Sequence, residues 1–401
     1  MFKKKFIALV MATLVAGSAL TGCGSSGKTS KSKELTVWTK VTDKEREVIQ
    51  THANNWGKEN GYEIKVLNDD GGAQDFLQVA NSGKAPDMYI GVGHDNLSTY
   101  QVAGVVDEVP SSFDRTGYVN DSVWNATAIG GKNYAVPFAQ ETVALLYNKD
   151  KVKEVPKTME ELIEVAKAHG PNGFQIDLGN FYITGGIIQT TGGYIFGGEQ
   201  GNLNAKDIGL ASPGSIAGFQ FLQDLVQKHK LMPVDVTGDI ASANFKSGES
   251  IFYISGSWDI AQMVDAGINL GVAEVPSIGG KPYKSFLGVQ TGFVTAKSSK
   301  KEDAWKLMEY LSKNMAEDYF KAGKRIPVRQ SVIDSGLTAE DPYFKGFLDQ
   351  SKNAVPMPNI IEMQAVWGST GSISRIIKGE DPSVVAPDIV DGIKKGIQTQ
   401  Q

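Results

Sequence analysis

The chain has 401 residues, a formal net charge of −5 and a single cysteine, Cys23. A mildly acidic chain has no net attraction for nucleic acid or for anionic membrane surfaces, which argues against both as partners. One cysteine also excludes an internal disulfide and cysteine-rich zinc sites. The length exceeds what one ordinary hydrophobic core supports, so two domains are expected.

The N-terminus has the parts of a bacterial export signal. Three lysines at positions 3–5 precede an apolar run over residues 6–20, and Leu-Thr-Gly-Cys follows it, ending at Cys23. The run is shorter than the ~20 residues of a membrane span, as in a cleaved signal. The closing residues resemble the lipobox of bacterial lipoproteins. We expect residues 1–22 to be the signal peptide and Cys23 to carry a lipid; the alternative is an ordinary signal cut elsewhere.

Residues 24–33 contain Gly, Ser, Lys and Thr and no apolar side chain, so we expect 23–33 to be a flexible tether. Residues 22–29 match the phosphate-loop spacing of two glycines, a lysine and a threonine. Such a loop binds phosphate only between a strand and a helix, where backbone amides converge. Here a signal peptide precedes it and a tether follows, so the match is interpreted as chance.

Strands and helices alternate after the tether. Residues 34–39 alternate polar and apolar as a strand does, and an amphipathic helix capped by Asp43 is expected to end near Gly61. A strand at 62–66, a helix at 73–81 and a strand at 87–90 follow. This βαβαβ order predicts a parallel sheet with helices on its faces.

Further strands are expected at 134–138 and 142–147, around Glu141, and at 251–254. Ser-Gly-Ser at 255–257 is expected to interrupt the last of these before Trp258.

Helices are expected where capping residues precede apolar residues at helical spacing. These starts are the capping box of Thr158 and Glu161, the Ser212-Pro213 pair, and a cap at residues 299–302. The final third is mainly helical. The fold class is therefore α/β with two lobes.

Catalytic signatures are absent from the sequence. The four histidines (His52, His94, His169 and His229) lack metal-ligand spacing, and no Gly-x-Ser-x-Gly motif occurs. His94, at the end of a strand, is interpreted as a loop residue, with a general base as the alternative. We expect no metal and no cofactor.

Three aromatic residues stand out by their positions: Trp258 follows Ser-Gly-Ser at a strand end, Trp367 lies between residues 363–366 and Gly368, and Tyr182 is expected in a loop. Loops at the carboxyl ends of strands are where ligands collect in open α/β sheets. An aromatic face suits the apolar face of a sugar ring, and carboxylates accept sugar hydroxyl protons. Each aromatic residue alone is more often part of a core, the interpretation that fits Trp38, Trp56 and Trp305.

Several segments then identify a family. Tyr-Asn-Lys-Asp at 147–150 and Ser-Gly-Ser-Trp at 255–258 resemble the extracellular solute-binding proteins of ABC importers. Met-Pro-Asn-Ile at 357–360, followed by Trp367, is similar to the maltose/maltodextrin-binding branch. Further matches lie at 85–88, 94–95, 135–141, 192–196 and 245–249, so the resemblance covers nearly the whole chain from residue 34.

The resemblance implies a periplasmic-binding-protein-like fold with a ligand cleft between two lobes that close about a hinge. Residues 34–140 plus 288–336 would form the N-terminal lobe, and residues 141–287 plus 337–401 the C-terminal lobe. Glu141 and Asp95 would bond sugar hydroxyls. Trp258, Trp367 and Tyr182 would stack on glucose rings, with Asn180, Asp43 and Lys44 as further polar contacts.

The sequence departs from the maltose-binding pattern at four positions. Val92 stands where relatives have Trp, Asn96 where they have Arg, Asn180 where they have Glu, and Gly371 where they have Arg. These changes alter the hydrogen bonds available to particular sugar rings, so chain length and linkage preference stay open.

The function expected is therefore a non-enzymatic, lipid-anchored component of an ABC sugar importer. It would be a monomer on the outer face of the cell membrane that captures maltodextrins and delivers them to the permease. One alternative is another oligosaccharide, such as a cyclodextrin or an isomaltose-type sugar. Another is a cell-surface glycoside hydrolase using Glu141 with Asp95 as its two carboxylates.

Overall fold

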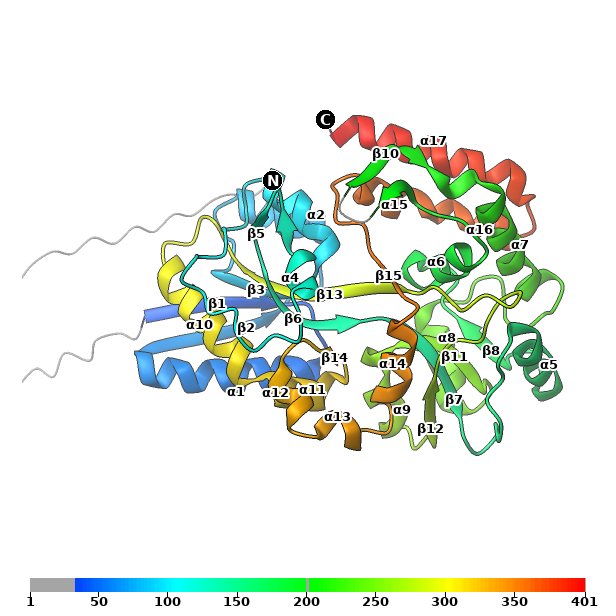
Figure 1. The fold of residues 1–401 in the computed structure, drawn as a ribbon, viewed down its shortest axis with the longest axis horizontal. Helices are drawn as coiled ribbons and strands as arrows, with labels where there is room; N and C mark the ends of the chain where they lie inside the picture. The colour runs from blue at the N-terminus through cyan, green and yellow to red at the C-terminus, as the bar shows by residue number, and fades with distance from the viewer. Residues whose placement is uncertain (1–32, 200–201, 401) are drawn as a thin grey trace, which may run out of the picture. The chain divides into compact units, whose positions relative to one another are not determined.

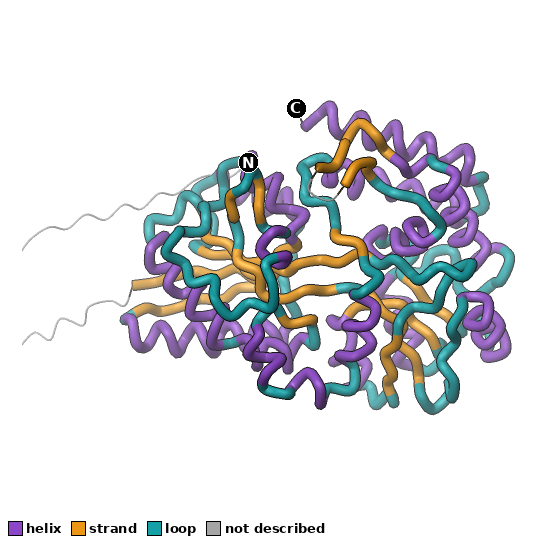
Figure 2. Tube along the Cα trace, viewed as in Figure 1, coloured by secondary structure: helices purple, strands orange, loops and turns teal. Residues whose placement is uncertain are grey.

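The computed structural model describes residues 33–199 and 202–400, which form two main sheets with helices packed on their faces (Figures 1 and 2). The 7-stranded first sheet has the order β14-β6-β13-β3-β1-β2, with β15 beside β13. Its strands are β1 (Lys33–Thr39), β2 (Tyr62–Asn68), β3 (Met88–Gly93), β6 (Val136–Glu141), β13 (Phe286–Val294), β14 (Ile326–Pro327) and β15 (Val355–Pro356).

The 4-stranded second sheet has the order β12-β7-β11-β8. Its strands are β7 (Val143–Asn148), β8 (Phe174–Ile176), β11 (Phe252–Gly256) and β12 (Leu270–Ala273). Two small antiparallel pairs add β4 (Ala128–Ile129) with β5 (Lys132–Asn133), and β9 (Phe196–Glu199) with β10 (Asn202–Ile208).

Helices connect the strands and form much of the last third of the chain, as expected. They are α1 (Asp43–Asn60), α2 (Ala73–Asn81), α3 (Leu97–Val102), α4 (Ser122–Asn125), α5 (Met159–His169), α6 (Phe181–Thr190), α7 (Pro213–Gln227), α8 (Gly238–Ser247), α9 (Ile260–Asp265), α10 (Lys301–Asn314), α11 (Ala316–Gly323), α12 (Gln330–Asp334), α13 (Leu337–Glu340), α14 (Phe344–Ser351), α15 (Met363–Ser369), α16 (Ile373–Ile377) and α17 (Pro382–Gln400).

The parallel arrangement predicted at the start of the chain is confirmed. Strand β1 pairs in parallel with both β2 and β3. The sheet becomes mixed beyond β3, because β13 runs antiparallel to β3 and to β6.

Side chains alternate between the two faces of each sheet and build separate cores. On β7, Val143 and Leu145 join one cluster while Ala144 and Leu146 join another. Trp56 and Trp305 are buried beside the first sheet, and Trp38 packs against Phe76 and Tyr89 on its other face, so their interpretation as core residues is confirmed.

Helix starts follow the predicted caps in two places and differ in two. Thr158 caps α5 in a capping box with Glu161, and Ser212 caps α7. The prediction that Asp43 caps α1 is wrong: Thr42 does so, because its hydroxyl accepts from the Glu45 N–H. The cap expected at 299–302 is also wrong, since Lys300 at the cap position makes no side-chain capping hydrogen bond to the first turn of α10.

The chain passes from the first sheet to the second at Thr142. Strand β6 ends at Glu141 and β7 begins at Val143. The buried Thr142 hydroxyl donates to the Phe286 carbonyl at 2.7 Å, which ties this crossing to the start of β13. Two of the expected lobe boundaries, 140/141 and 287/288, fall within β6 and β13, and the third, 336/337, falls at the start of α13. All three stay a prediction.

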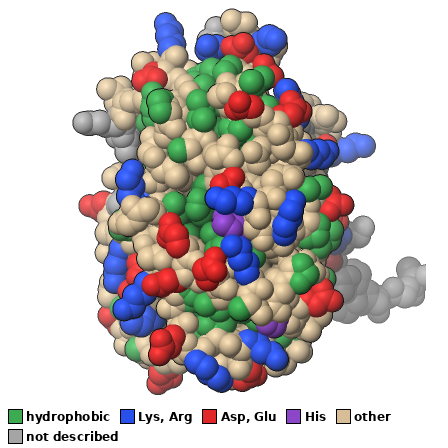
Figure 3. Space-filling view, turned by 90° about the vertical axis from the view of Figure 1, so that its right-hand side faces the viewer, with side chains coloured by type: hydrophobic (Ala, Val, Ile, Leu, Met, Phe, Trp, Pro, Cys, Tyr) green, Lys and Arg blue, Asp and Glu red, His purple; other side chains and the backbone are tan. Residues whose placement is uncertain are grey.

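No helix within the described residues is both long and apolar enough to cross a membrane. On the face shown in Figure 3, acidic and basic side chains are interspersed. Cys23, most of the tether and the 22–29 motif lie outside the described residues.

Candidate functional site

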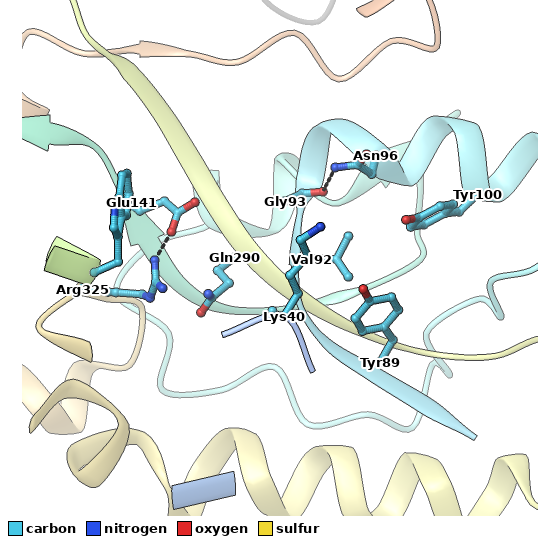
Figure 4. A pocket seen from close by; sticks show the side chains of 11 residues that line it. Lys40, Tyr89, Val92, Gly93, Asn96, Tyr100, Glu141, Gln290 and Arg325 are labelled. Atoms are coloured by element: carbon cyan, nitrogen blue, oxygen red, sulfur yellow. Dashed lines mark hydrogen bonds and ion pairs between the residues drawn. The ribbon is translucent and has the colours of Figure 1, made fainter. Parts of the chain in front are cut away.

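A cavity of about 300 Å³ opens where residues of both sheets meet, and it is called the Glu141 cavity below (Figure 4). Its lining is mainly polar and aromatic: Lys40, Tyr89, Gly91, Val92, Gly93, Asn96, Tyr100, Glu141, Trp258, Gln290 and Arg325. The carboxyl ends of β1, β3, β6 and β11 supply Lys40, Gly93, Glu141 and Trp258, as expected for a ligand site in an open sheet.

A backbone irregularity shapes one wall of this cavity. Strand β3 pairs with β13 through Ile90 and Val92, so Gly91 between them is an extra residue, a β-bulge. Gly91 has φ +98, and a Cβ there would lie 2.6 Å from the Lys40 carbonyl oxygen. Only glycine suits both conditions, so Gly91 lets β3 end against the segment that carries Lys40.

Two carboxylates share one guanidinium at the base of the cavity. Arg325 contacts Glu141 through Nη1 (Figure 4), and it contacts Glu45 through Nε at 2.6 Å and Nη2 at 3.2 Å. The Arg325 side chain is 6% exposed, the Glu45 side chain 0% and the Glu141 side chain 20%. Of the three charged groups, Glu141 therefore has the most contact with solvent and is best placed to meet a ligand.

The carboxyl groups of Glu45 and Glu141 respond differently to this shared cation. Burial alone raises the pKa of Glu45, but the charge and hydrogen bonds of Arg325 with those of Thr42 bring its pKa below the ordinary value. Burial raises the pKa of Glu141, and Arg325 offsets only part of this because Glu45 and Asp95 add negative charge nearby.

Tyr182 and Trp258 lie beside Glu141. The Tyr182 hydroxyl donates to the backbone carbonyl of Glu141 at 3.1 Å. The centres of the Tyr182 and Trp258 rings lie 6.2 Å apart. Tyr182 also stacks on Phe286, at 5.9 Å. The prediction that Tyr182 lies in a loop is wrong, because it occupies the first turn of α6.

Trp367 and Asp95 are joined across the chain. The Trp367 indole donates to Asp95 Oδ2 at 3.0 Å, and its ring packs edge-on against Phe286, the ring on which Tyr182 stacks. Trp367 lies within α15, in the part of the chain expected to be mainly helical. Burial raises the pKa of Asp95 to about 6, and the indole hydrogen bond offsets part of the shift.

The raised pKa of Asp95 gives a prediction on stability. The folded protein keeps a proton on Asp95 between about pH 4 and pH 6, where the unfolded chain has lost it, so stability falls as pH rises through this window. Above this window, the ionisation of buried Asp95 lowers the free energy of unfolding by about 3 kcal/mol. Asp95→Asn is expected to be more stable than the parent above pH 6 and to lack this decline, as measured by urea unfolding of ligand-free protein.

The comparison between parent and variant isolates Asp95 from His94. Burial lowers the pKa of His94 to about 4, which gives an opposite slope in the same window, but both proteins share it. An identical pH slope in Asp95→Asn and its parent contradicts the prediction.

His94, expected to be a loop residue with a general base as the alternative, lies in a 3₁₀ turn and is buried. This turn is η1 (His94–Asn96). The His94 Nδ1 accepts from the Val289 N–H at 3.0 Å, and Nε2 lies 3.3 Å from the Met357 carbonyl. Both ring nitrogens are thus used to hold η1 against β13 and the segment after β15.

The other predicted ligand residues lie apart from the Glu141 cavity. Asp43 and Lys44 line a second cavity of about 180 Å³, which shares Trp258 with the first. Lys44 pairs with Asp265 of α9 at 2.9 Å. Asn180 is exposed and caps α6, with Oδ1 accepting from the Tyr182 N–H at 3.0 Å.

Sequence reasoning missed three polar residues of the Glu141 cavity: Lys40, Gln290 and Arg325. Lys40 directly follows β1, so the rule about strand ends could have found it. Of the positions that depart from the maltose-binding pattern, Val92 and Asn96 line the cavity, whereas Gly371 lies in the 3₁₀ turn Thr370–Ser372.

Comparison with known proteins identifies the family. Residues 52–346 match the model of the bacterial extracellular solute-binding protein family. The maltooligosaccharide ABC transporter solute-binding lipoprotein of Streptococcus pneumoniae is 30% identical over 98% of this chain and 97% of its own. The galactooligosaccharide-binding protein of Bacillus subtilis is 29% identical over 90% of this chain and 89% of its own.

Solved structures agree with this assignment and confirm the fold class. The maltose-maltodextrin binding protein of Alicyclobacillus acidocaldarius has a TM-score of 0.86 and 34% identity, covering 90% of this chain and 100% of its own. The maltotriose binding protein of Thermus thermophilus has a TM-score of 0.84 and 30% identity with the same coverage. The protein thus has the two-lobed periplasmic binding protein fold. This chain belongs to the bacterial extracellular solute-binding protein family.

Proposed function

We propose that the protein captures maltodextrins and delivers them to the membrane subunits of an ABC importer. The observation that carries this proposal is the Glu141 cavity, which the Glu141 carboxylate and the Trp258 ring line together, with the Tyr182 ring 6.2 Å from that of Trp258. Aromatic faces bury the apolar faces of glucose rings, and carboxylates accept hydrogen bonds from their hydroxyls. The S. pneumoniae, A. acidocaldarius and T. thermophilus relatives support this sugar class by their names.

Capture would be coupled to closure of the two lobes. Glu141 ends β6 of the first sheet, whereas Trp258 follows β11 of the second, so one sugar touching both joins residues from the two sheets. A ligand that contacts both lobes favours the closed form over the open one by its extra contacts. We place the hinge at the crossing strands near residues 140/141 and 287/288. Asp95, Asn180, Asp43 and Lys44 are proposed as outer contacts for longer sugars.

The proposed function is binding without chemistry. Glu141 and Asp95 are the carboxylates that a hydrolase would use, but membership of a solute-binding family favours hydrogen bonding by both. Purified protein incubated with maltotetraose is expected to leave it intact. Release of glucose or maltose would overturn the binding-only proposal.

A ligand panel tests the sugar class. Maltose, maltotriose and longer maltodextrins are expected to raise the thermal midpoint, because a ligand present at 100 times its Kd adds about 2.7 kcal/mol to stability. Cyclodextrin, isomaltose and a galactooligosaccharide form the comparison set, the last because of the B. subtilis relative. Stabilisation by the comparison set alone contradicts maltodextrin as the ligand.

We also propose that Cys23 carries the lipid anchor and that the protein acts as a monomer at the outer face of the membrane. The S. pneumoniae relative is named a lipoprotein. Cys23→Ser is expected to leave no thiol for lipid attachment, so the protein appears in the culture medium. Immunoblots of membrane and medium fractions measure this, and retention of the variant at the membrane refutes lipid anchoring at Cys23.

A further inference from the structure

The Glu141 cavity contains a buried cation whose function the sugar-binding proposal leaves unexplained. Arg325 lies between α11 and β14, and its guanidinium is 6% exposed. A buried guanidinium is costly to desolvate unless it is paired, and here it is paired twice, with Glu45 and with Glu141. The two partners have different surroundings, which suggests different roles.

Glu45 anchors the guanidinium. It is fully buried on α1, it accepts from two nitrogens of Arg325, and its Oε2 also accepts from the Thr42 N–H at 2.9 Å and the Thr42 hydroxyl at 2.8 Å. The backbone of Gly323 leaves no room for a side chain, because a Cβ there would collide with the Glu45 carboxylate. The position of Glu45 is thus fixed by its own helix cap and by the end of α11.

Glu141 is the partner that faces the cavity. It contacts one nitrogen of Arg325. Its side chain is 20% exposed, against 6% for Arg325 and 0% for Glu45. An ionised carboxylate here accepts sugar hydroxyls strongly, whereas a protonated one loses part of that capacity. What keeps Glu141 ionised therefore sets how well the cavity binds sugar.

We propose that Arg325 is a positioning residue of the sugar site, which holds the Glu141 carboxylate ionised and directed at the cavity while Glu45 holds Arg325. This inference rests on the function proposed above. The titratable and charged groups near Glu141 are Arg325, Glu45 on α1, Asp95 on η1, Lys40 after β1, Tyr182 on α6 and Tyr319 on α11. Burial, Glu45 and Asp95 raise the pKa of Glu141, and Arg325 lowers it.

The first measurement is the titration of Glu141 in ligand-free protein. Glutamate labelled with ¹³C at the carboxyl carbon gives an NMR signal for each Glu, and Glu141→Gln assigns the signal of interest. Arg325→Met is expected to raise the pH of half-protonation of Glu141 by about 1 to 3 pH units, the usual effect of losing an adjacent opposite charge. Glu45→Gln is expected to lower it, because a negative neighbour is removed.

The second measurement is the affinity for maltotriose as a function of pH, by calorimetry. Arg325→Met is expected to move the acid loss of affinity to higher pH, Glu45→Gln to move it to lower pH, and Arg325→Lys to restore most of the parent profile. Arg329→Met is the matched control: Arg329 is also buried, packs on the Tyr118 ring at 4.4 Å and does not line the Glu141 cavity. If Arg325 had a purely structural role, Arg325→Met would lower the affinity for maltotriose by the same factor at every pH.

The outcomes separate the two proposals. If Arg325→Met and Arg329→Met both keep the parent titration of Glu141, Arg325 does not act through Glu141 and the inference is overturned. If Arg325→Met does not fold, the opposite-signed shift in Glu45→Gln and the restored profile in Arg325→Lys decide the matter. If the parent binds no maltodextrin, the proposed function fails, while the NMR titration still tests the link between Arg325 and Glu141.

Discussion

Replacing Trp258 with Ala is expected to weaken maltotriose binding by about 1–3 kcal/mol, roughly 5- to 150-fold. Trp258 lies in the 3₁₀ turn Ser257–Asp259 directly after β11, and it lines both the Glu141 cavity and the cavity that contains Lys44. The ring lies against Gly256, where a Cβ would collide with it. This fit fixes the ring, so little side-chain entropy is lost when a sugar stacks on it.

Calorimetry on matched variants distinguishes stacking from packing at Trp258. Trp258→Phe keeps a flat apolar face and is expected to recover part of the lost affinity. Trp305→Phe changes a tryptophan of the core, 6% exposed and away from both cavities, and is expected to leave affinity unchanged. An affinity of Trp258→Ala equal to that of the parent would show that this ring does not touch the sugar.

Arg325→Met is expected to lower the free energy of unfolding by about 3–5 kcal/mol at neutral pH. The loss arises because Glu45, which is fully buried, keeps its charge while its cation is gone. Other buried arginines need not have this effect: Arg329 packs on an aromatic ring and pairs with no carboxylate in the ion pairs of the described residues. Urea unfolding of Arg325→Met and Arg329→Met measures the difference.

The pH dependence of that loss has a definite sign. In the parent the pKa of Glu45 is lowered. The stabilisation that ionised Glu45 adds to the folded protein is therefore complete at neutral pH and is lost as the pH falls through the acid range. Without Arg325, burial raises the pKa of Glu45. As the pH falls, protonation then removes the unpaired buried charge, and the variant regains part of its stability. The difference between parent and variant should shrink toward acid pH, and Glu45→Gln combined with Arg325→Met should recover part of the stability. A loss that is constant with pH contradicts this account.

Local signals in the sequence were sufficient for most elements and for some of their ends. The capping box at Thr158 and the Ser-Pro start at Ser212 depend on contacts within a few residues, and both predictions are confirmed. Where two candidate caps are adjacent, as at Thr42 and Asp43, sequence does not distinguish them, because the choice depends on the backbone angles at the helix entry.

The site was predictable only in part. Family resemblance singled out Glu141, Tyr182 and Trp258, which the structure brings together. It also singled out Asp43 and Lys44, which line the neighbouring cavity instead. The short segment Gly-Asn-Phe-Tyr at 179–182 has no apolar period and predicts a loop at Tyr182, yet Asn180 caps a helix there and Tyr182 lies in its first turn, facing Trp258.

The sequence by itself determined the α/β class, the order of the first strands and the family, because periodicity, caps and motifs are encoded over short distances. Only the tertiary structure showed that Arg325 joins Glu141 and Glu45, which lie 184 and 280 positions away in the chain. No local pattern marks an arginine between a helix and a two-residue strand as a partner for such distant carboxylates. The pairing exists because α1, β6 and the end of α11 meet at the base of one cavity, where burial makes each charge depend on the others.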